Sequence, residues 1–173
     1  LQAAVGGHLP DFLAARGVII DLRKNGGGDT SVAGFIAGLL TDHPLHGAAW
    51  RTREHRAAEL AWSVFAKEDT ERHRYALERG GWHREPATVW QHNPDFHTSA
   101  PVIVLTDWRT ASAAEDFLVI IDELPQVTKV GRRTFGSSGQ PLYFSLPGGG
   151  TARICAKRDT YPDGRDFVGT GVI

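Results

Sequence analysis

The sequence contains no methionine, a single cysteine and no excess of charge of either sign. One cysteine excludes an internal disulfide. The formal net charge of −1 gives no electrostatic reason to expect nucleic acid or an anionic membrane surface as a partner. No apolar run approaches the roughly 20 residues that a membrane span requires, so we expect no span in this chain. The 41% hydrophobic and 23% charged content is typical of a globular domain.

The sequence also lacks the usual signs of complete ends, because it starts at Leu1 without a methionine and stops at Ile173 in mid-pattern. We therefore expect an excerpt or a processed product of a longer chain. Its 173 residues suffice for one domain with a hydrophobic core. The prediction is a single domain over residues 1–173 with an irregular insert at 42–100.

Motifs for nucleotides and metals are absent as well. Gly26-Gly27-Gly28 follows a strand-like run, but it has neither the Gly-x-x-x-x-Gly-Lys nor the Gly-x-Gly-x-x-Gly spacing. The eight histidines form no His-Glu-x-x-His pair and have no cysteine cluster beside them. Cys155 lies in an alternating run and is expected to be a small, buried strand residue. We expect no metal site and no cofactor.

Two strand–turn–helix patterns are present. Residues 17–22 form a continuous apolar run, typical of a strand buried on both faces of a parallel sheet, and a helical pattern follows over 31–40. Residues 102–106 predict a second buried strand, and an amphipathic helix begins at Ser112. Repeated βα units indicate an α/β fold with ligands at the carboxyl ends of the strands.

The remaining stretches are less regular. In the insert, residues 50–53 predict a short strand, residues 56–79 an interrupted helix, and residues 82–97 a loop rich in aromatic and histidine residues. Beyond Pro125 the pattern turns to β structure. A short strand is expected at 127–130, followed by a hairpin that pairs 141–146 with 151–157 through Pro147-Gly-Gly-Gly150.

Ser112 lies where a strand ends and a helix begins. A serine there is suited to attack a carbonyl, because the first-turn N–H groups and the helix dipole favour a developing oxyanion. It is equally suited to be a plain helix N-cap. The adjacent glycines after Asp21 permit either an oxyanion donor or an ordinary tight turn. The spacing alone does not decide whether Ser112 is a nucleophile or a cap, nor whether the glycines supply a donor or only a turn.

Residue order does not reveal the base that a nucleophilic serine needs, because such groups are assembled in space. The candidates without a distinguishing context are the histidines His43, His46, His83, His92 and His97 and the lysines Lys24, Lys67, Lys129 and Lys157.

Several motifs resemble one protein family. Asp21-Leu-Arg-Lys-Asn25-Gly-Gly27-Gly28 resembles the Asp-Leu-Arg-x-Asn-x-Gly-Gly signature of the tail-specific, or C-terminal-processing, serine protease superfamily. That superfamily includes tricorn-like proteases and the repeats of interphotoreceptor retinoid-binding protein. Thr110-Ala-Ser112-Ala-Ala-Glu115 resembles its nucleophile segment. Three later phrases follow in the family's order, at 131–140, 146–150 and 161–173.

The resemblance implies a crotonase- and ClpP-like core of βα units with a C-terminal β-hairpin region, and a serine endopeptidase acting on peptides or proteins. Ser112 would be the nucleophile and Gln140 would help to position the site. The backbone N–H of Ala113 and that of Gly27 or Gly28 would form the oxyanion hole. The family also implies the cell envelope, the periplasm or secretion, and it leaves homo-oligomer formation open. The alternative is an inactive member that binds peptide or a hydrophobic ligand.

One departure from the family concerns the base. Many relatives carry Phe-Gly-Lys-Gly-x-x-Gln with the lysine as general base, whereas here Ser137 stands at the lysine position. The tricorn-like branch uses an upstream histidine and a glutamate that corresponds to Val168 here. Asp166 would replace that glutamate only if it pointed inward. If the site is active, we therefore expect its base, a histidine as in the tricorn-like branch, to come from the insert or from outside this chain.

Overall fold

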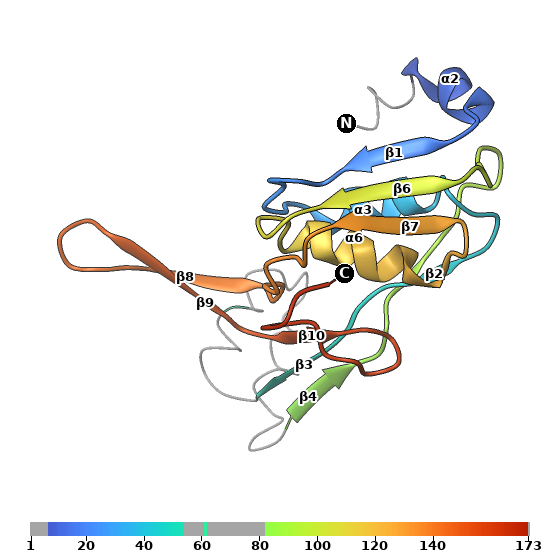
Figure 1. The fold of residues 1–173 in the computed structure, drawn as a ribbon. Helices are drawn as coiled ribbons and strands as arrows, with labels where there is room; N and C mark the ends of the chain where they lie inside the picture. The colour runs from blue at the N-terminus through green and yellow to red at the C-terminus, as the bar shows by residue number, and fades with distance from the viewer. Residues whose placement is uncertain (1–6, 54–60, 62–81, 173) are drawn as a thin grey trace.

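The computed structural model of the chain describes residues 7–53, 61 and 82–172, and the account below concerns those residues. Its central element is a three-stranded parallel sheet in the order β1 (Val18–Asp21), β6 (Val102–Thr106) and β7 (Val127–Gly131) (Figure 1). β6 lies in the middle, where Val102 pairs with Val18 on one side and with Val127 on the other. All three carboxyl ends therefore meet at one edge.

Two helices pack together with this sheet: α3 (Thr30–Ala37) follows β1, and α6 (Ala113–Ile120) follows β6 (Figure 1). A short 3₁₀ helix, η1 (Ile121–Glu123), continues α6, and α2 (Leu9–Ala14) precedes β1. The two predicted βα units are thus confirmed. Both have the carboxyl end of a parallel strand leading through a turn into a helix.

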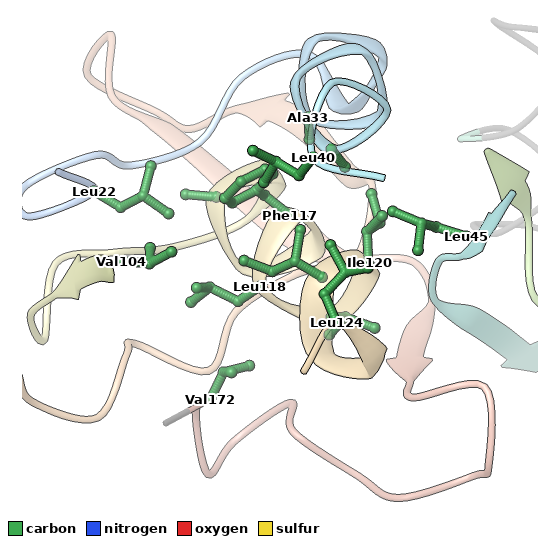
Figure 2. Packing of buried hydrophobic residues seen from close by; sticks show 14 of the residues in the cluster. Leu22, Ala33, Leu40, Leu45, Val104, Phe117, Leu118, Ile120, Leu124 and Val172 are labelled. Carbon is green, nitrogen blue, oxygen red and sulfur yellow. The ribbon is translucent and has the colours of Figure 1, made fainter. Parts of the chain in front are cut away.

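The helix α6 occupies the centre of the hydrophobic core. Figure 2 shows Phe117 beside Leu40, and Leu118 near Val104 of the sheet. All eight residues of α6 are buried, so the predicted amphipathic pattern is wrong in one respect: no polar face reaches solvent. The helix packs within one cluster that joins the sheet, α3 and C-terminal residues such as Phe167.

The strand β1 differs from the prediction of burial on both faces. Its residues alternate between half-buried and exposed, and Ile19 is 70% exposed. The reason is position, because β1 is an edge strand and the helices cover only one face of the sheet in the described part of the chain.

The insert is more regular than its sequence indicates. The strand expected near residue 50 is confirmed as β3 (Ala49–Arg53), but the predicted loop at 82–97 contains β4 (Trp82–Glu85) and β5 (Val89–Trp90). β4 and the unpredicted β10 (Arg158–Thr160) flank β3 in an antiparallel sheet, and β2 (Leu45–His46) pairs with β5. The helix predicted over 56–79 lies outside the described residues apart from Ala61.

The predicted C-terminal hairpin is confirmed. It consists of β8 (Pro141–Ser145) and β9 (Thr151–Cys155) and extends away from the rest of the fold (Figure 1). Cys155 lies in β9 but is exposed, so the expectation that it is buried is wrong. The reason is that this ribbon projects into solvent, where alternation along a strand does not create a buried face.

Candidate active site

The turns after β1 and β6 lie against each other at the carboxyl edge of the sheet. The Thr110 hydroxyl donates to the Leu22 carbonyl at 2.8 Å, and the Ala111 N–H donates to the Asn25 carbonyl at 3.0 Å. Thr110 is fully buried, so its bond is shielded from competing water. These bonds hold the glycine turn next to Ser112, although Thr110 and Leu22 are 88 residues apart in the sequence.

Ser112 adopts a strained backbone conformation, with φ 56° and ψ −128°. Such a conformation costs roughly 1–3 kcal/mol for a residue other than glycine and persists only where its surroundings enforce it. It is typical of the sharp strand-to-helix turn that exposes a nucleophilic serine. The N-cap interpretation is correct as to position, since Ser112 precedes the first residue of α6. The strain distinguishes this serine from an ordinary cap.

The buried Glu115 enforces this turn. Its fully buried carboxylate accepts four hydrogen bonds, and none of the donors is a cation. They are the Thr134 hydroxyl at 2.5 Å and the N–H groups of Gly136 at 2.6 Å, Ser137 at 2.8 Å and Ser112 at 3.1 Å. The Ser112 N–H also donates to the Ser137 carbonyl at 2.9 Å. One side chain thereby joins the start of α6 to the segment that follows β7.

Gly27 contacts the turn at Ser112 directly. A Cβ at this position would lie 2.5 Å from Ser112 Cβ and 2.8 Å from the Ala113 nitrogen, and φ is +96°. Only glycine fits both restrictions. The Gly27 N–H donates to Asn25 Oδ1 at 3.0 Å, so it is already occupied. Gly27 is therefore a spacer rather than a free donor.

Two backbone N–H groups beside Ser112 are unoccupied. In the described part of the chain, neither the Gly28 N–H nor the Ala113 N–H has a hydrogen-bond acceptor. Ala113 is the first residue of α6, where the helix leaves its N–H groups unpaired and the dipole is positive. Both residues line one apolar cavity, which lies between β1, α3 and the start of α6. This arrangement can accept a negatively charged oxygen.

A second buried carboxylate, Asp116, lies one residue beyond Glu115. It accepts hydrogen bonds from the Thr30 hydroxyl at 2.8 Å and the Ser138 hydroxyl at 2.7 Å. Burial, and then the nearby Asp159 carboxylate, raise the pKa of Asp116 above its usual value. Lys157 offsets part of this repulsion, because its Nζ lies 2.6 Å from Asp159 Oδ1. Asp116 thus joins α3, α6 and the segment after β7.

Five of the nine candidate bases are paired with carboxylates. Within the described residues, no histidine or lysine nitrogen is hydrogen-bonded to Ser112 Oγ, and Lys67 falls outside them. The observed partners are Asp42 for His43, Glu123 for His46, Glu85 for His83, Asp122 for Lys129 and Asp159 for Lys157.

The other predicted site residues differ in their placement. Ser137 lies beside Ser112 through the backbone bond described above, and its Oγ is 3.9 Å from Cys155 Sγ. Gln140 has φ +37°, and its carbonyl accepts the Ala156 N–H at 3.1 Å. Asp166 does not meet the condition for replacing the tricorn-like glutamate, because its carboxylate is exposed and pairs with Arg158 at 3.0 Å.

The described residues also bear on metals and membranes. Among them, no group of three or more histidine, cysteine, aspartate or glutamate side chains is placed to hold a metal ion. The same part of the chain contains no helix with the length and apolar character needed to span a membrane.

Sequence reasoning assigned no role to Glu115 or Asp116. A signal for Glu115 was present, because Ser112-x-x-Glu115 has the capping-box spacing and the glutamate does bond to the Ser112 N–H. Asp116 had no comparable signal, since its partners Thr30 and Ser138 are remote in the sequence.

Three solved structures illustrate what the chain resembles. A candidate peptidase from Parabacteroides merdae is 23% identical with a TM-score of 0.72, over 99% of this chain and 48% of that one. Mature CPAF is 18% identical with a TM-score of 0.73, over 98% and 40%. The photosystem II D1 C-terminal processing protease is 21% identical with a TM-score of 0.60, over 99% and 37%. This chain therefore spans less than half of each.

These likenesses confirm the predicted crotonase- and ClpP-like α/β core. No curated protein sequence matches the chain. The model of peptidase family S41, in contrast, matches residues 7–173, which is nearly the whole chain. The protein belongs to peptidase family S41, as the tail-specific protease motifs in its sequence predicted.

Proposed function

We propose that this chain carries the nucleophile and the oxyanion hole of a serine endopeptidase. Ser112 attacks the carbonyl carbon of a peptide bond, and the N–H groups of Ala113 and Gly28 stabilise the oxyanion. The C–N bond then breaks and the amine leaves with the proton taken from the Ser112 hydroxyl. The acyl group remains on Ser112 as an ester until water hydrolyses it to a carboxylic acid and frees the serine. The observation that carries the proposal is the strained Ser112 turn with two unoccupied N–H groups beside it.

The choice of Gly28 over Gly27 follows from the hydrogen bonds. The Gly27 N–H is held by Asn25 Oδ1, whereas the Gly28 N–H is available. Each such donor contributes roughly 3 kcal/mol of transition-state stabilisation in comparable hydrolases. Ser137 and Gln140 remain proposed positioning residues, with Ser137 acting through its backbone.

The proton acceptor in this mechanism is a residue of the 42–100 insert or of a region outside this sequence. Ser137 is no substitute for the lysine, because an alcohol does not take up a proton at neutral pH. The second candidate function, an inactive member that binds peptide or a hydrophobic ligand, is favoured by Ser137 and by the apolar cavity beside Ser112. Peptide or protein substrates, an envelope, periplasmic or secreted location, and homo-oligomer formation remain proposals from family resemblance.

A fluorophosphonate probe separates the two functions. We expect the full-length protein to be labelled at Ser112 and to hydrolyse an unstructured protein substrate, with both signals lost in Ser112→Ala. Ser138→Ala is a matched control, because its hydroxyl bonds to Asp116 and not to the reacting atoms. A folded wild-type protein that takes up no label would exclude the peptidase and favour the binding function.

A further inference from the structure

We propose that the outward face of the antiparallel sheet of β10, β3 and β4 is a docking site for an acidic segment of a polypeptide. Arg158, Arg51 and Arg84 lie side by side across this sheet, one on each strand, and are called the arginine ladder below. The sheet is separate from the parallel sheet that positions the Ser112 turn (Figure 1). Binding at this surface therefore does not depend on the proposed peptidase function.

The strand register puts the three arginines on one face. Arg51 is directly opposite both Arg158 and Arg84, and directly opposite residues in an antiparallel sheet project from the same face. Side chains alternate along a strand, so the neighbours Thr52 and His83 point the other way, and both are buried. Arg84 and Arg158 are exposed, and 33% of the Arg51 side chain is accessible. The ladder therefore faces solvent.

This row of like charges is unfavourable for the fold. Like charges directly opposite each other in a sheet destabilise it, and arginine cannot lose its charge by deprotonation. Asp166 offsets part of the charge, because its Oδ1 lies 3.0 Å from Arg158 Nε and 3.7 Å from Arg51 Nη2. Among the described residues, Arg84 has neither an ion pair nor a hydrogen-bonded side chain. The surface thus keeps positive charge that an anionic ligand can neutralise.

Arg53 and Trp82 extend the same face. They are opposite each other, and Arg53 is two residues beyond Arg51 on β3. The Trp82 ring centroid lies 4.9 Å from the guanidinium carbon of Arg53 and 5.6 Å from that of Arg51. Contact with the ring orients a guanidinium without neutralising its charge, so its N–H groups stay able to donate to a ligand.

The geometry favours carboxylates carried by an extended peptide. Asp166 already places one carboxylate beside two arginines of the ladder, and the planar guanidinium fits a carboxylate through two parallel N–H···O bonds. Arg51 and Arg53 are two strand residues apart, which corresponds to roughly 6.5 Å. Alternate side chains of an extended peptide have the same spacing. A segment with acidic residues at alternate positions therefore matches this face.

Nucleic acid is a less suitable anion for this surface. Unpaired bases bind by stacking on aromatic rings, and two arginines already contact the Trp82 ring. Asp166 places a negative charge within the surface, and the whole chain has a formal net charge of −1. Both features weaken the attraction of a polyanion, which depends on charge over a long stretch.

The test measures binding of a fluorescent peptide with glutamate at alternate positions to the full-length protein, by fluorescence anisotropy. We expect this peptide to bind, the matched glutamine peptide not to bind, and added salt to weaken the complex. Arg84→Gln should weaken binding roughly twofold to fivefold, and the double variant Arg51→Gln/Arg84→Gln about tenfold. The control is Arg153→Gln, an exposed arginine opposite Tyr143 on the projecting hairpin, which should leave binding unchanged.

Stability of the same variants gives a second readout. Arg84→Gln removes a cross-strand repulsion, so its midpoint of chemical denaturation should lie above that of Arg153→Gln. A midpoint no higher than the control contradicts the uncompensated charge of the ladder.

The binding outcomes decide the ligand. A glutamate peptide that does not bind, or that binds Arg84→Gln as tightly as Arg153→Gln, overturns the docking site. A single-stranded oligonucleotide that binds more tightly than the peptide, and is released by the same substitutions, overturns the assignment to a polypeptide. If the double variant does not fold, Arg84→Gln alone decides, because its exposed side chain has no partner to lose among the described residues.

Discussion

The two strand–turn–helix units share one local plan but differ in how the rest of the chain surrounds them. β6 is the central strand, and all eight residues of α6 are buried. β1 is an edge strand, and α3 buries three of its eight residues. The enclosed unit contains the strained Ser112, whereas the open unit contains the glycine turn and much of the cavity wall. The proposed nucleophile is strained and needs support on every side, and the proposed substrate needs access.

We expect the largest effect of any substitution at the contact between the two units. In Gly27→Ala the new Cβ would meet Ser112 and Ala113, at a residue with φ +96°. We expect fluorophosphonate labelling to slow by about 100-fold or more, because small displacements of reacting groups have effects of this size. The measurement is the rate of labelling at fixed probe concentration.

Gly26→Ala is the control for this substitution. Its added Cβ would meet nothing within 4 Å, and its φ is not in the left-handed region. Labelling at the wild-type rate in Gly27→Ala would show that the two units are not in contact as described.

The enclosed unit depends on its buried carboxylate. Glu115→Gln replaces one accepting oxygen with an NH₂ group that faces hydrogen-bond donors. We expect the free energy of unfolding to fall by about 1–3 kcal/mol, the usual cost of leaving buried polar groups unsatisfied. Chemical denaturation measures this change.

Glu123→Gln is the control, because Glu123 is exposed and its Oε1 accepts the His46 N–H, which an amide oxygen can still do. Equal stability of the two variants would mean that Glu115 does not hold the turn.

The open unit should lose less stability than the enclosed unit when its own capping carboxylate is removed. Asp29 is the N-cap of α3, and its side chain accepts the Ser31 N–H at 2.8 Å while remaining exposed. Asp29→Ala should lower the free energy of unfolding by roughly 1 kcal/mol, as for other N-caps. A loss larger than that of Glu115→Gln in the same denaturation series would reverse the ranking of the two units.

The smallest expected effect is the contribution of Asp116 to the pH dependence of stability. The pKa of Asp116 is raised in the folded protein by burial and by Asp159, with Lys157 opposing. The folded state therefore binds this proton more tightly than the unfolded state, and the stabilisation it provides is lost as pH rises through the folded pKa. The Asp116→Asn protein has no carboxyl group at this position, so it does not lose this stabilisation as pH rises.

The stability of Asp116→Asn relative to wild type should consequently improve between about pH 4 and pH 7. Denaturation at both pH values measures the difference. A relative stability that does not change with pH would show that Asp116 has the same pKa in both states.

How far the site could be predicted is clear from individual residues. The positions of Ser112 and the glycine turn follow from strand-like runs that end in turn residues before helical spacing, whereas the roles expected for Ser112, Ala113 and the glycines follow from the family resemblance. The conformation of Ser112 and the occupied N–H of Gly27 do not follow, because each depends on partners that the local pattern does not name. Asp166 illustrates the same limit, since only its pairing with Arg158 decides that it points outward.

The sequence by itself determined the two βα units, the C-terminal hairpin and the family, because periodicity, turn residues and motif order are local properties. The tertiary structure alone decided that β1 is an edge strand, that α6 is buried all round, and that a cavity opens beside Gly28 and Ala113. The physical reason is that burial and hydrogen-bond choice depend on which distant segments pack together. No spacing of residues along the chain encodes that directly.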